Sequence, residues 1–159
     1  MRKEIIGQRS GAAKSQDDDW LDLDLIASVQ LTSEDPEYPI ENALSKNPER
    51  NEMGWRAAAP GPQTITLTFD TPQRVRRIHL LFIEHRTERT QEFVLSYSSS
   101  GEAEREIVRQ QWNFSPTGAS QEIEDYVVEI GSMTKLQLVI DPDRGPGRAL
   151  ATLNTLRLA

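Results

Sequence analysis

The stretch "QTITLTF", residues 63–69, carries the pattern on which the fold prediction rests. Its apolar residues Ile65, Leu67 and Phe69 alternate with threonines. Successive side chains of a β-strand point to opposite faces, so the stretch predicts a strand with one face on a core and the other in water. Threonine also suits the pleated surface of a sheet because its side chain is β-branched.

Similar runs with a period near two follow one another from Trp20 to the end of the chain. They are separated by "DTPQ", "SSSG", "SPTG", "GS" and "DPDRGPG", each of which contains the Pro or Gly that turns favour. Eight antiparallel strands of this length predict an all-β fold, a jelly-roll β-sandwich. The eight candidate strands are residues 25–32, 63–69, 75–83, 91–98, 106–114, 122–130, 134–140 and 152–158.

The size and charge of the chain limit its domain count and its partners. A chain of 159 residues and 18.0 kDa is long enough for one well-buried domain. Its 25 acidic and 18 basic residues give a net charge of -7, which would repel a nucleic-acid backbone or an anionic membrane. We therefore expect neither as a partner. The lack of cysteine excludes disulfides and thiolate metal sites, so stability must come from core packing.

The N-terminal segment is polar and ends in three consecutive aspartates, whose charges repel one another. We expect a flexible acidic arm over residues 1–19 and a single β-sandwich domain over residues 20–159. The longest early apolar run is Ile5 and Ile6, which is too short for a signal peptide or a membrane span. The expected localisation is therefore cytoplasmic.

Residues 35–62 lack the strand pattern. This segment holds five prolines and no alternating run, which predicts a long loop with one helical turn at "IENALSK", residues 40–46. Loops of this length commonly carry function or close the edge of a core.

Four stretches of the chain together suggest a family. They are "YPIENALSKNPERNEMGW", "QTITLTFDTPQRVRRIHLLF", "QEFVLSYSSSGEAEREIVRQQWNF" and "TKLQLVIDPDRGPGRALATLNTLRLA". Their order and spacing resemble the discoidin-like, or coagulation-factor type C, domain of the galactose-binding-like superfamily. The resemblance covers residues 25–159 and implies the same jelly roll. It also implies a carbohydrate-binding module that holds a glycan or another small polar ligand in loops at one end, without catalysis.

The resemblance assigns candidate ligand-binding residues to the polar connection "EHRTERTQ", residues 84–91. Sugar-binding members of the family use a His, an Arg and an Asn or Glu from neighbouring loops, together with an aromatic ring. The positions that match are His85, Arg86 and Arg89, with Gln91, Trp112 and Asn113 at the margin of the site. Trp112 shares strand parity with Val108 and Phe114, which favours core packing over stacking on a sugar.

Many members of the family also hold a structural calcium ion, through an acidic residue after Asn-Ala-Leu and a carboxylate near the C-terminus. This chain has Ser45 at the first position and Asn154 at the second. Losing two carboxylates removes most of the attraction of such a site for a hard cation, so we expect no calcium and no other cofactor.

The residue types do not support an enzyme. The only histidines, His79 and His85, lie in no nucleophile motif, and the glycine-rich "DRGPGRA" has no phosphate-loop lysine. Three alternatives to glycan binding stay open. The 84–91 connection could be a solvated turn, or the same loops could grip a protein partner or an oligomer mate, with "GWRAAAPGP", residues 54–62, as the apolar candidate. The chain could also be an accessory domain for a separate enzyme.

Overall fold

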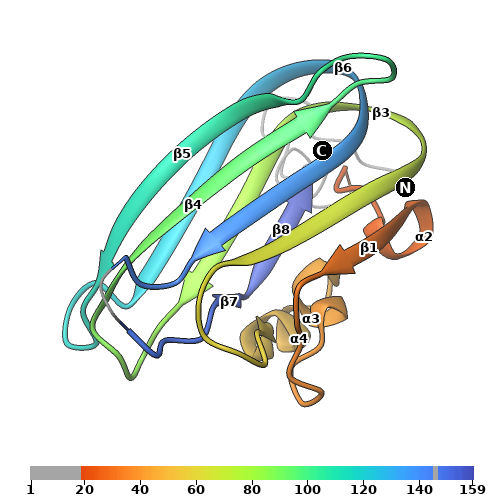
Figure 1. The fold of residues 1–159 in the computed structure, drawn as a ribbon. Coiled ribbons are helices and arrows are strands. Elements are labelled where there is room, and N and C mark those ends of the chain that lie inside the picture. Colours follow the sequence, from red (N-terminus) through yellow and green to blue (C-terminus); the bar gives the residue numbers. More distant parts are fainter. Residues whose placement is uncertain (1–18, 145–146) are drawn as a thin grey trace, which may run out of the picture.

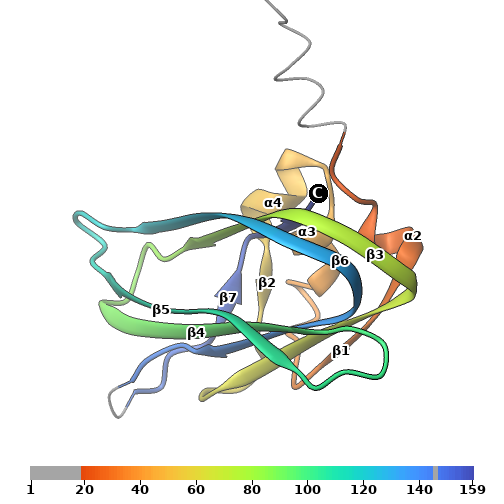
Figure 2. The same cartoon turned by 90° about the horizontal axis from the view of Figure 1, so that it is seen from above.

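The computed structural model describes residues 19–144 and 147–159, which form two facing β-layers with short helices at one side (Figures 1 and 2). Most of the predicted arm, residues 1–18, lies outside the described residues. None of the helices in the described part of the chain has the length and apolar content needed to cross a lipid bilayer. In chain order the elements are α2 (Leu23–Ile26), β1 (Ala27–Leu31), α3 (Ile40–Leu44), α4 (Pro48–Met53), β2 (Trp55–Arg56), β3 (Gln63–Ile83), β4 (Arg89–Ser98), β5 (Arg105–Phe114), β6 (Gln121–Asp141), β7 (Thr152–Leu153) and β8 (Thr155–Leu158).

Two long strands, β3 and β6, pair antiparallel and run through both layers. The first half of β3 pairs with β1 and with the second half of β6, where Leu67 lies opposite Leu136. The second half of β3 pairs with β8 and with the first half of β6, where Leu81 lies opposite Ile123. β4 and β5 extend the first layer, in the order β1-β3-β6-β4-β5, while β2 and β7 form a separate pair. Figures 1 and 2 show both long strands curving from one layer into the other.

The strand boundaries differ from the prediction at these bends. "DTPQ" and "GS" were expected to be turns between strands, but they lie inside β3 and β6. The pairing register shifts between Thr68 and Gln73, between Gln73 and Val75, and between Val75 and Arg77. Such bulges bend a strand and interrupt its hydrogen-bond ladder, so Pro72 is tolerated although it has no N–H to donate. Residues 25–26 belong to α2, and residues 152–158 divide at Asn154 into β7 and β8. β4 begins at Arg89, two residues before the predicted strand, and the short strand β2 lies inside the predicted loop.

The core lies between the two layers. The burial of residues 63–69 confirms the alternation predicted for "QTITLTF". Ile65, Leu67 and Phe69 are all buried, while the intervening threonines are more exposed. Phe82 of β3 and Phe93 of β4 are fully buried, and their ring centroids lie 5.3 Å apart, within the range of favourable aromatic pairs. This pair joins the second half of β3 to the first layer.

The segment 35–62 packs against the C-terminal strands. The predicted helical turn is confirmed as α3, and a second helix, α4, follows it. Asn47 caps α4 by accepting a hydrogen bond from the Glu49 N–H at 2.9 Å. Gly54 ends α4 with a φ of 65°, and a Cβ there would lie 2.8 Å from the Leu153 carbonyl oxygen, so α4 closely approaches β7. Trp55, in the apolar candidate surface 54–62, is 1% exposed and belongs to the core.

We expect the Phe82–Phe93 contact to be a main source of stability. Phe82→Ala should lower the free energy of unfolding by about 3–5 kcal/mol, because it removes a fully buried ring and leaves a cavity. Val127→Ala is the control, since Val127 is 88% exposed and its truncation should cost less than about 0.5 kcal/mol. Urea denaturation followed by circular dichroism measures both. Equal losses in the two variants would contradict this description of the core.

Candidate functional site

A cleft of about 510 Å³ opens at the end of the sandwich where β3 stops. This volume lies within the range of small-ligand sites. Its walls come from the 35–62 segment, the connection between β3 and β4, the start of β6, and β7. The lining residues are Tyr38, Glu52, Met53, Arg56, Ile83, Glu84, His85, Arg86, Gln121, Thr152 and Asn154.

Glu84 organises the connection between β3 and β4. One of its carboxylate oxygens accepts hydrogen bonds from the backbone N–H groups of Arg86 at 3.1 Å and Thr87 at 3.3 Å. The other accepts from Arg89 Nε at 2.8 Å. Burial alone would raise the pKa of Glu84, but the hydrogen bonds from Arg89, Arg86 and Thr87 hold that pKa below its ordinary value. A charged Glu84 therefore holds this turn in one conformation.

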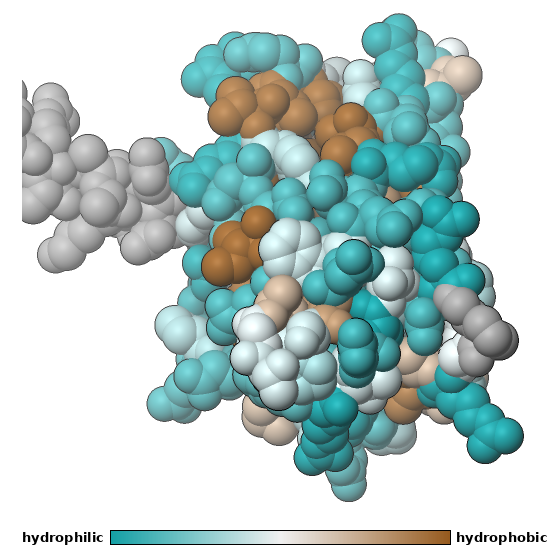
Figure 3. All heavy atoms as spheres, turned by 90° about the vertical axis from the view of Figure 1, so that its left-hand side faces the viewer, coloured by the Kyte–Doolittle hydropathy of each residue, from teal (hydrophilic) through white to brown (hydrophobic). Residues whose placement is uncertain are grey.

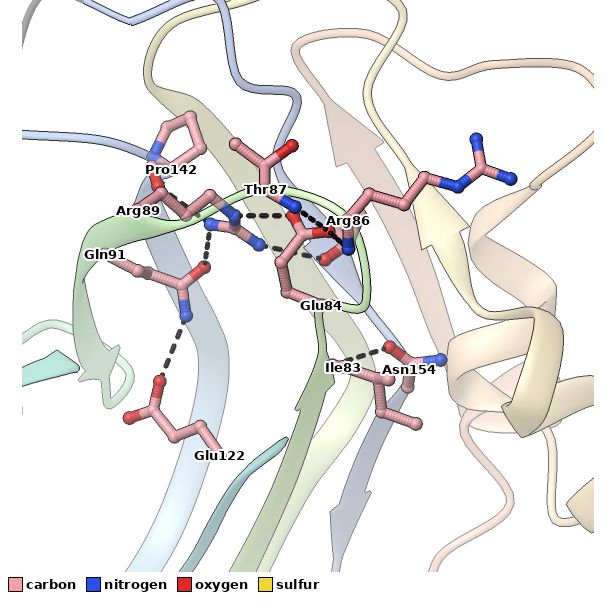
Figure 4. Close-up of polar contacts among 10 residues, drawn as sticks. Ile83, Glu84, Arg86, Thr87, Arg89, Gln91, Glu122, Pro142 and Asn154 are labelled. Carbon is pink, nitrogen blue, oxygen red and sulfur yellow. Dashed lines mark hydrogen bonds and ion pairs between the residues drawn. The ribbon is translucent and has the colours of Figure 1, made fainter. Parts of the chain in front are cut away.

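His85 and Arg86 are exposed and line the cleft, so both are available for the predicted ligand contacts. Figure 4 shows the Arg86 side chain pointing away from the Arg89 network, on the other side of the turn. The backbone of the turn is held by Glu84, so these two side chains extend from a fixed base. That geometry suits directional hydrogen bonds to a ligand.

Arg89 lies inside the protein, although its residue type and position predicted a ligand contact. Its side chain is 0% exposed, stacks over the Phe114 ring at 4.6 Å, and hydrogen-bonds Glu84. It also donates to Gln91 Oε1 at 3.0 Å and to the Pro142 carbonyl at 2.7 Å (Figure 4). Because the side chain is buried, its Nε and Nη1 donate internally, and Nη2 lies 3.4 Å from the Thr152 hydroxyl, the structure places Arg89 in the framework behind the turn.

Gln91 and Glu122 continue this network into the core. Gln91 is 0% exposed and donates from Nε2 to Glu122 Oε1 at 3.1 Å. Glu122 is also 0% exposed, and its other oxygen has no hydrogen-bond partner among the described residues. Burial, together with the nearby charge of Glu124, raises the pKa of Glu122 to about 8. Gln91 therefore supports Arg89 from below and does not reach the cleft surface.

Trp112 and Asn113 do not line the cleft. Trp112 is half-buried and packs against the core from β5, as its strand parity indicated. Asn113 is exposed and accepts a hydrogen bond from the Thr90 hydroxyl at 2.9 Å. The structure therefore brings together His85 and Arg86 of the six predicted residues, with Arg89 and Gln91 behind them.

Tyr38, Met53 and Arg56 are cleft residues that sequence reasoning missed. The Arg56 guanidinium lies 3.9 Å from the centroid of the Tyr38 ring and pairs with Asp35 at 3.5 Å. Met53 is 57% exposed although it is apolar. The length and proline content of the 35–62 segment signalled a functional loop, but only the fold shows which of its side chains reach the 84–91 connection.

Three asparagines join the cleft to the helices. Asn154 accepts from the Ile83 N–H at 3.0 Å and donates to the carbonyls of Asn51 at 3.0 Å and Glu52 at 3.2 Å. Arg50 donates to Asn42 Oδ1, and Arg157 donates to Asn51 Oδ1. These carbonyl and amide oxygens are thus already engaged by N–H donors and by two guanidinium groups. Such a donor set does not fit calcium, which requires free oxygen ligands and attracts carboxylates.

No family model and no curated protein matches the chain in sequence. Solved structures do match its fold. A family 32 carbohydrate-binding module from a family 31 glycoside hydrolase of Clostridium perfringens has a TM-score of 0.65 at 18% identity, covering 92% of this chain and 96% of that one.

Two further modules of that kind were solved with sugars. A Clostridium perfringens module in complex with GalNAc-β-1,3-galactose has a TM-score of 0.62 at 17% identity, covering 87% of this chain and 98% of that one. The module of AlyQ in complex with 4,5-unsaturated mannuronic acid has a TM-score of 0.57 at 17% identity, covering 84% and 95%. The predicted all-β sandwich is therefore confirmed at the level of the fold.

The Arg89 network should be worth far more to stability than the exposed Arg86. Arg89→Met should lower the free energy of unfolding by about 3–5 kcal/mol, because it removes the positive charge that pairs with Glu84 and leaves the Gln91 and Pro142 acceptors without their donor. Arg86→Met, three residues away and exposed, should change it by less than about 0.5 kcal/mol. Urea denaturation at neutral pH makes the comparison. If Arg89→Met were as stable as Arg86→Met, the framework role would be wrong.

The buried Glu122 should impose a pH dependence on stability. Its pKa is about 8 in the folded protein against an ordinary 4.5, so between these values the folded state keeps a proton that the unfolded chain has released. Stability of the wild type should therefore fall as the pH rises through this range. Glu122→Gln cannot ionise, and at pH 9 it should be more stable than wild type by about 1–3 kcal/mol, with little difference near pH 4.

Urea denaturation between pH 4 and pH 9 measures this difference. Glu88→Gln is the matched control, because Glu88 is exposed and the same chemical change there should leave the pH profile unaltered. Parallel profiles for wild type and Glu122→Gln would show that Glu122 ionises normally.

Proposed function

We propose that the chain is a non-catalytic carbohydrate-binding module that holds a glycan in the 510 Å³ cleft. The observation that carries the proposal is the turn fixed by Glu84, which presents His85 and Arg86 to a cleft of ligand size. Its fold is shared with modules solved in complex with GalNAc-β-1,3-galactose and with an unsaturated mannuronic acid. No nucleic-acid or membrane partner belongs to the proposal.

The cleft offers both kinds of surface that a sugar uses. The imidazole of His85 and the guanidinium of Arg86 provide donors for hydroxyl or carboxylate oxygens. Tyr38 and Met53 provide apolar surface against which the C–H groups of a sugar ring can pack. Because the turn is already ordered, little conformational entropy is lost when the ligand binds. Single-site affinities should nevertheless be weak, on the order of millimolar to micromolar, because little apolar area is buried.

Two features support binding without catalysis. Of the two glutamates that line the cleft, Glu84 has both carboxylate oxygens engaged by Arg89 and by backbone N–H groups, which disfavours it as the acid or the base of a glycosidase pair. Within the described residues there is no group of three or more His, Asp or Glu side chains that could hold a metal ion. We further propose that binding is independent of calcium, since the amide network around Asn154 uses the oxygens that a cation would need.

The surface pattern favours a glycan over a protein partner at these loops. Figure 3 shows that the larger hydrophobic patches on this side of the molecule lie in its upper half, while the lower half mixes hydrophilic and intermediate side chains with small hydrophobic spots. Trp55 is buried, so the 54–62 segment lacks the exposed aromatic anchor typical of interface hot spots. A mostly polar surface with only a small apolar area at Tyr38 and Met53 suits a sugar better than a protein partner.

A glycan array followed by calorimetric titration of the hits tests this function. His85→Ala and Arg86→Ala should each weaken binding about tenfold, or about 1.4 kcal/mol, because each removes a fixed donor. Arg105→Ala removes an exposed arginine from the opposite end of β5 and should leave the affinity unchanged. Adding a chelator or excess calcium should also have no effect. A protein that binds no glycan at millimolar concentration, or variants that bind like wild type, would refute the proposal.

A further inference from the structure

A second hollow of about 200 Å³ adjoins the cleft on the side of the β6–β7 connection. The two share Arg56, Glu84, Arg86 and Thr152, so a ligand can extend from one into the other. The hollow adds Arg148 to this set. Three arginines from three separate segments of the chain therefore line one small space.

The charge of this space is positive although the protein is acidic. Arg86 and Arg148 are both exposed, and neither guanidinium has an ion-pair or hydrogen-bond partner among the residues that the structure describes. Glu84, the one carboxylate in the lining, is already neutralised by Arg89 at 2.8 Å. Arg56 is partly compensated by Asp35 at 3.5 Å. Two uncompensated positive charges thus remain at one spot on a chain of net charge -7.

We propose that this second hollow is a subsite for the carboxylate of an acidic glycan, so that the module selects uronic-acid sugars over neutral ones. The inference rests on the proposed function and specifies its ligand class. Planar guanidinium groups can bind a carboxylate through paired, charge-assisted hydrogen bonds. A neutral sugar could accept hydrogen bonds from these arginines through its hydroxyl groups, but it would leave their positive charges uncompensated. The remaining wall, formed by Ala149, Leu150 and Thr152, is small and largely apolar, which suits the flat face of a sugar ring.

The local positive charge also steers an acidic glycan toward the hollow. An acidic glycan is repelled by most of the protein surface and attracted only where positive charge is exposed. Selection therefore comes from repulsion elsewhere as well as from attraction at the hollow. Both terms weaken as salt is added, because exposed charges are screened.

Matched pairs of ligands test the subsite. Trisaccharides of galacturonic, glucuronic and mannuronic acid are each compared with their methyl esters, which keep the sugar and remove the charge. Calorimetric titration of the wild type should show at least one acid that binds about tenfold more tightly than its ester, with the preference shrinking at high salt. Arg148→Gln and Arg86→Gln should each reduce the ratio of acid to ester affinity by about fivefold or more. Arg105→Gln, the same change at the opposite end of the sandwich, should leave the ratio unchanged.

The outcomes separate this inference from the function on which it rests. If acids and esters bind equally, or only neutral or sulfated glycans on the array bind, the carboxylate subsite is refuted while glycan binding stands. The subsite is also refuted if the acid preference survives both arginine substitutions. If no neutral, acidic or esterified glycan binds, both the proposed function and the carboxylate subsite are refuted.

Discussion

The ion pair between Arg89 and Glu84, at 2.8 Å, is the contact on which the candidate site depends. A buried arginine is costly unless each of its donors finds a partner. Here the partners are Glu84, Gln91 and the Pro142 carbonyl, which lie just after β3, in β4 and just after β6. One guanidinium therefore ties together three strand ends, and the carboxylate that it fixes orders the turn that exposes His85 and Arg86.

This arrangement divides two arginines of one short connection into different roles. Arg89 is buried and fixed by its hydrogen bonds, whereas Arg86 is exposed and its positive charge has no ion-pair partner among the described residues. Binding sites commonly need both parts, a ligand-contacting group and a rigid support behind it. The protein has a net charge of -7, but Arg89 neutralises the negative charge of Glu84. Glu84 therefore does not cancel the positive charge of the exposed arginines nearby.

The architecture explains why the site lies at this end of the sandwich. β3 and β6 cross both layers, so their ends bring the connections of each layer to the same place. The 35–62 segment packs against β7 and β8, which places Tyr38 and Arg56 beside the 84–91 turn. Hydrogen bonds of Asn154 to Ile83 and to α4 link these parts, as Figure 4 shows for Ile83. The cleft is thus bordered by elements whose relative positions are fixed by strand pairing and by hydrogen bonds of the Asn154 side chain.

The sequence alone determined the strand content and the all-β class, because period-two alternation and turn residues report local geometry that survives in any fold. It also placed the polar connection at 84–91, since His85 and Arg86 stand between two clear strands. It could not show that β3 and β6 continue through "DTPQ" and "GS", because bulges arise from pairing between strands distant in sequence. Nor could it tell Arg86 from Arg89, which are equal as residue types. Only tertiary packing buried one beside Glu84 and Phe114, left the other exposed, and brought Tyr38, Arg56 and Arg148 to it from separate parts of the chain.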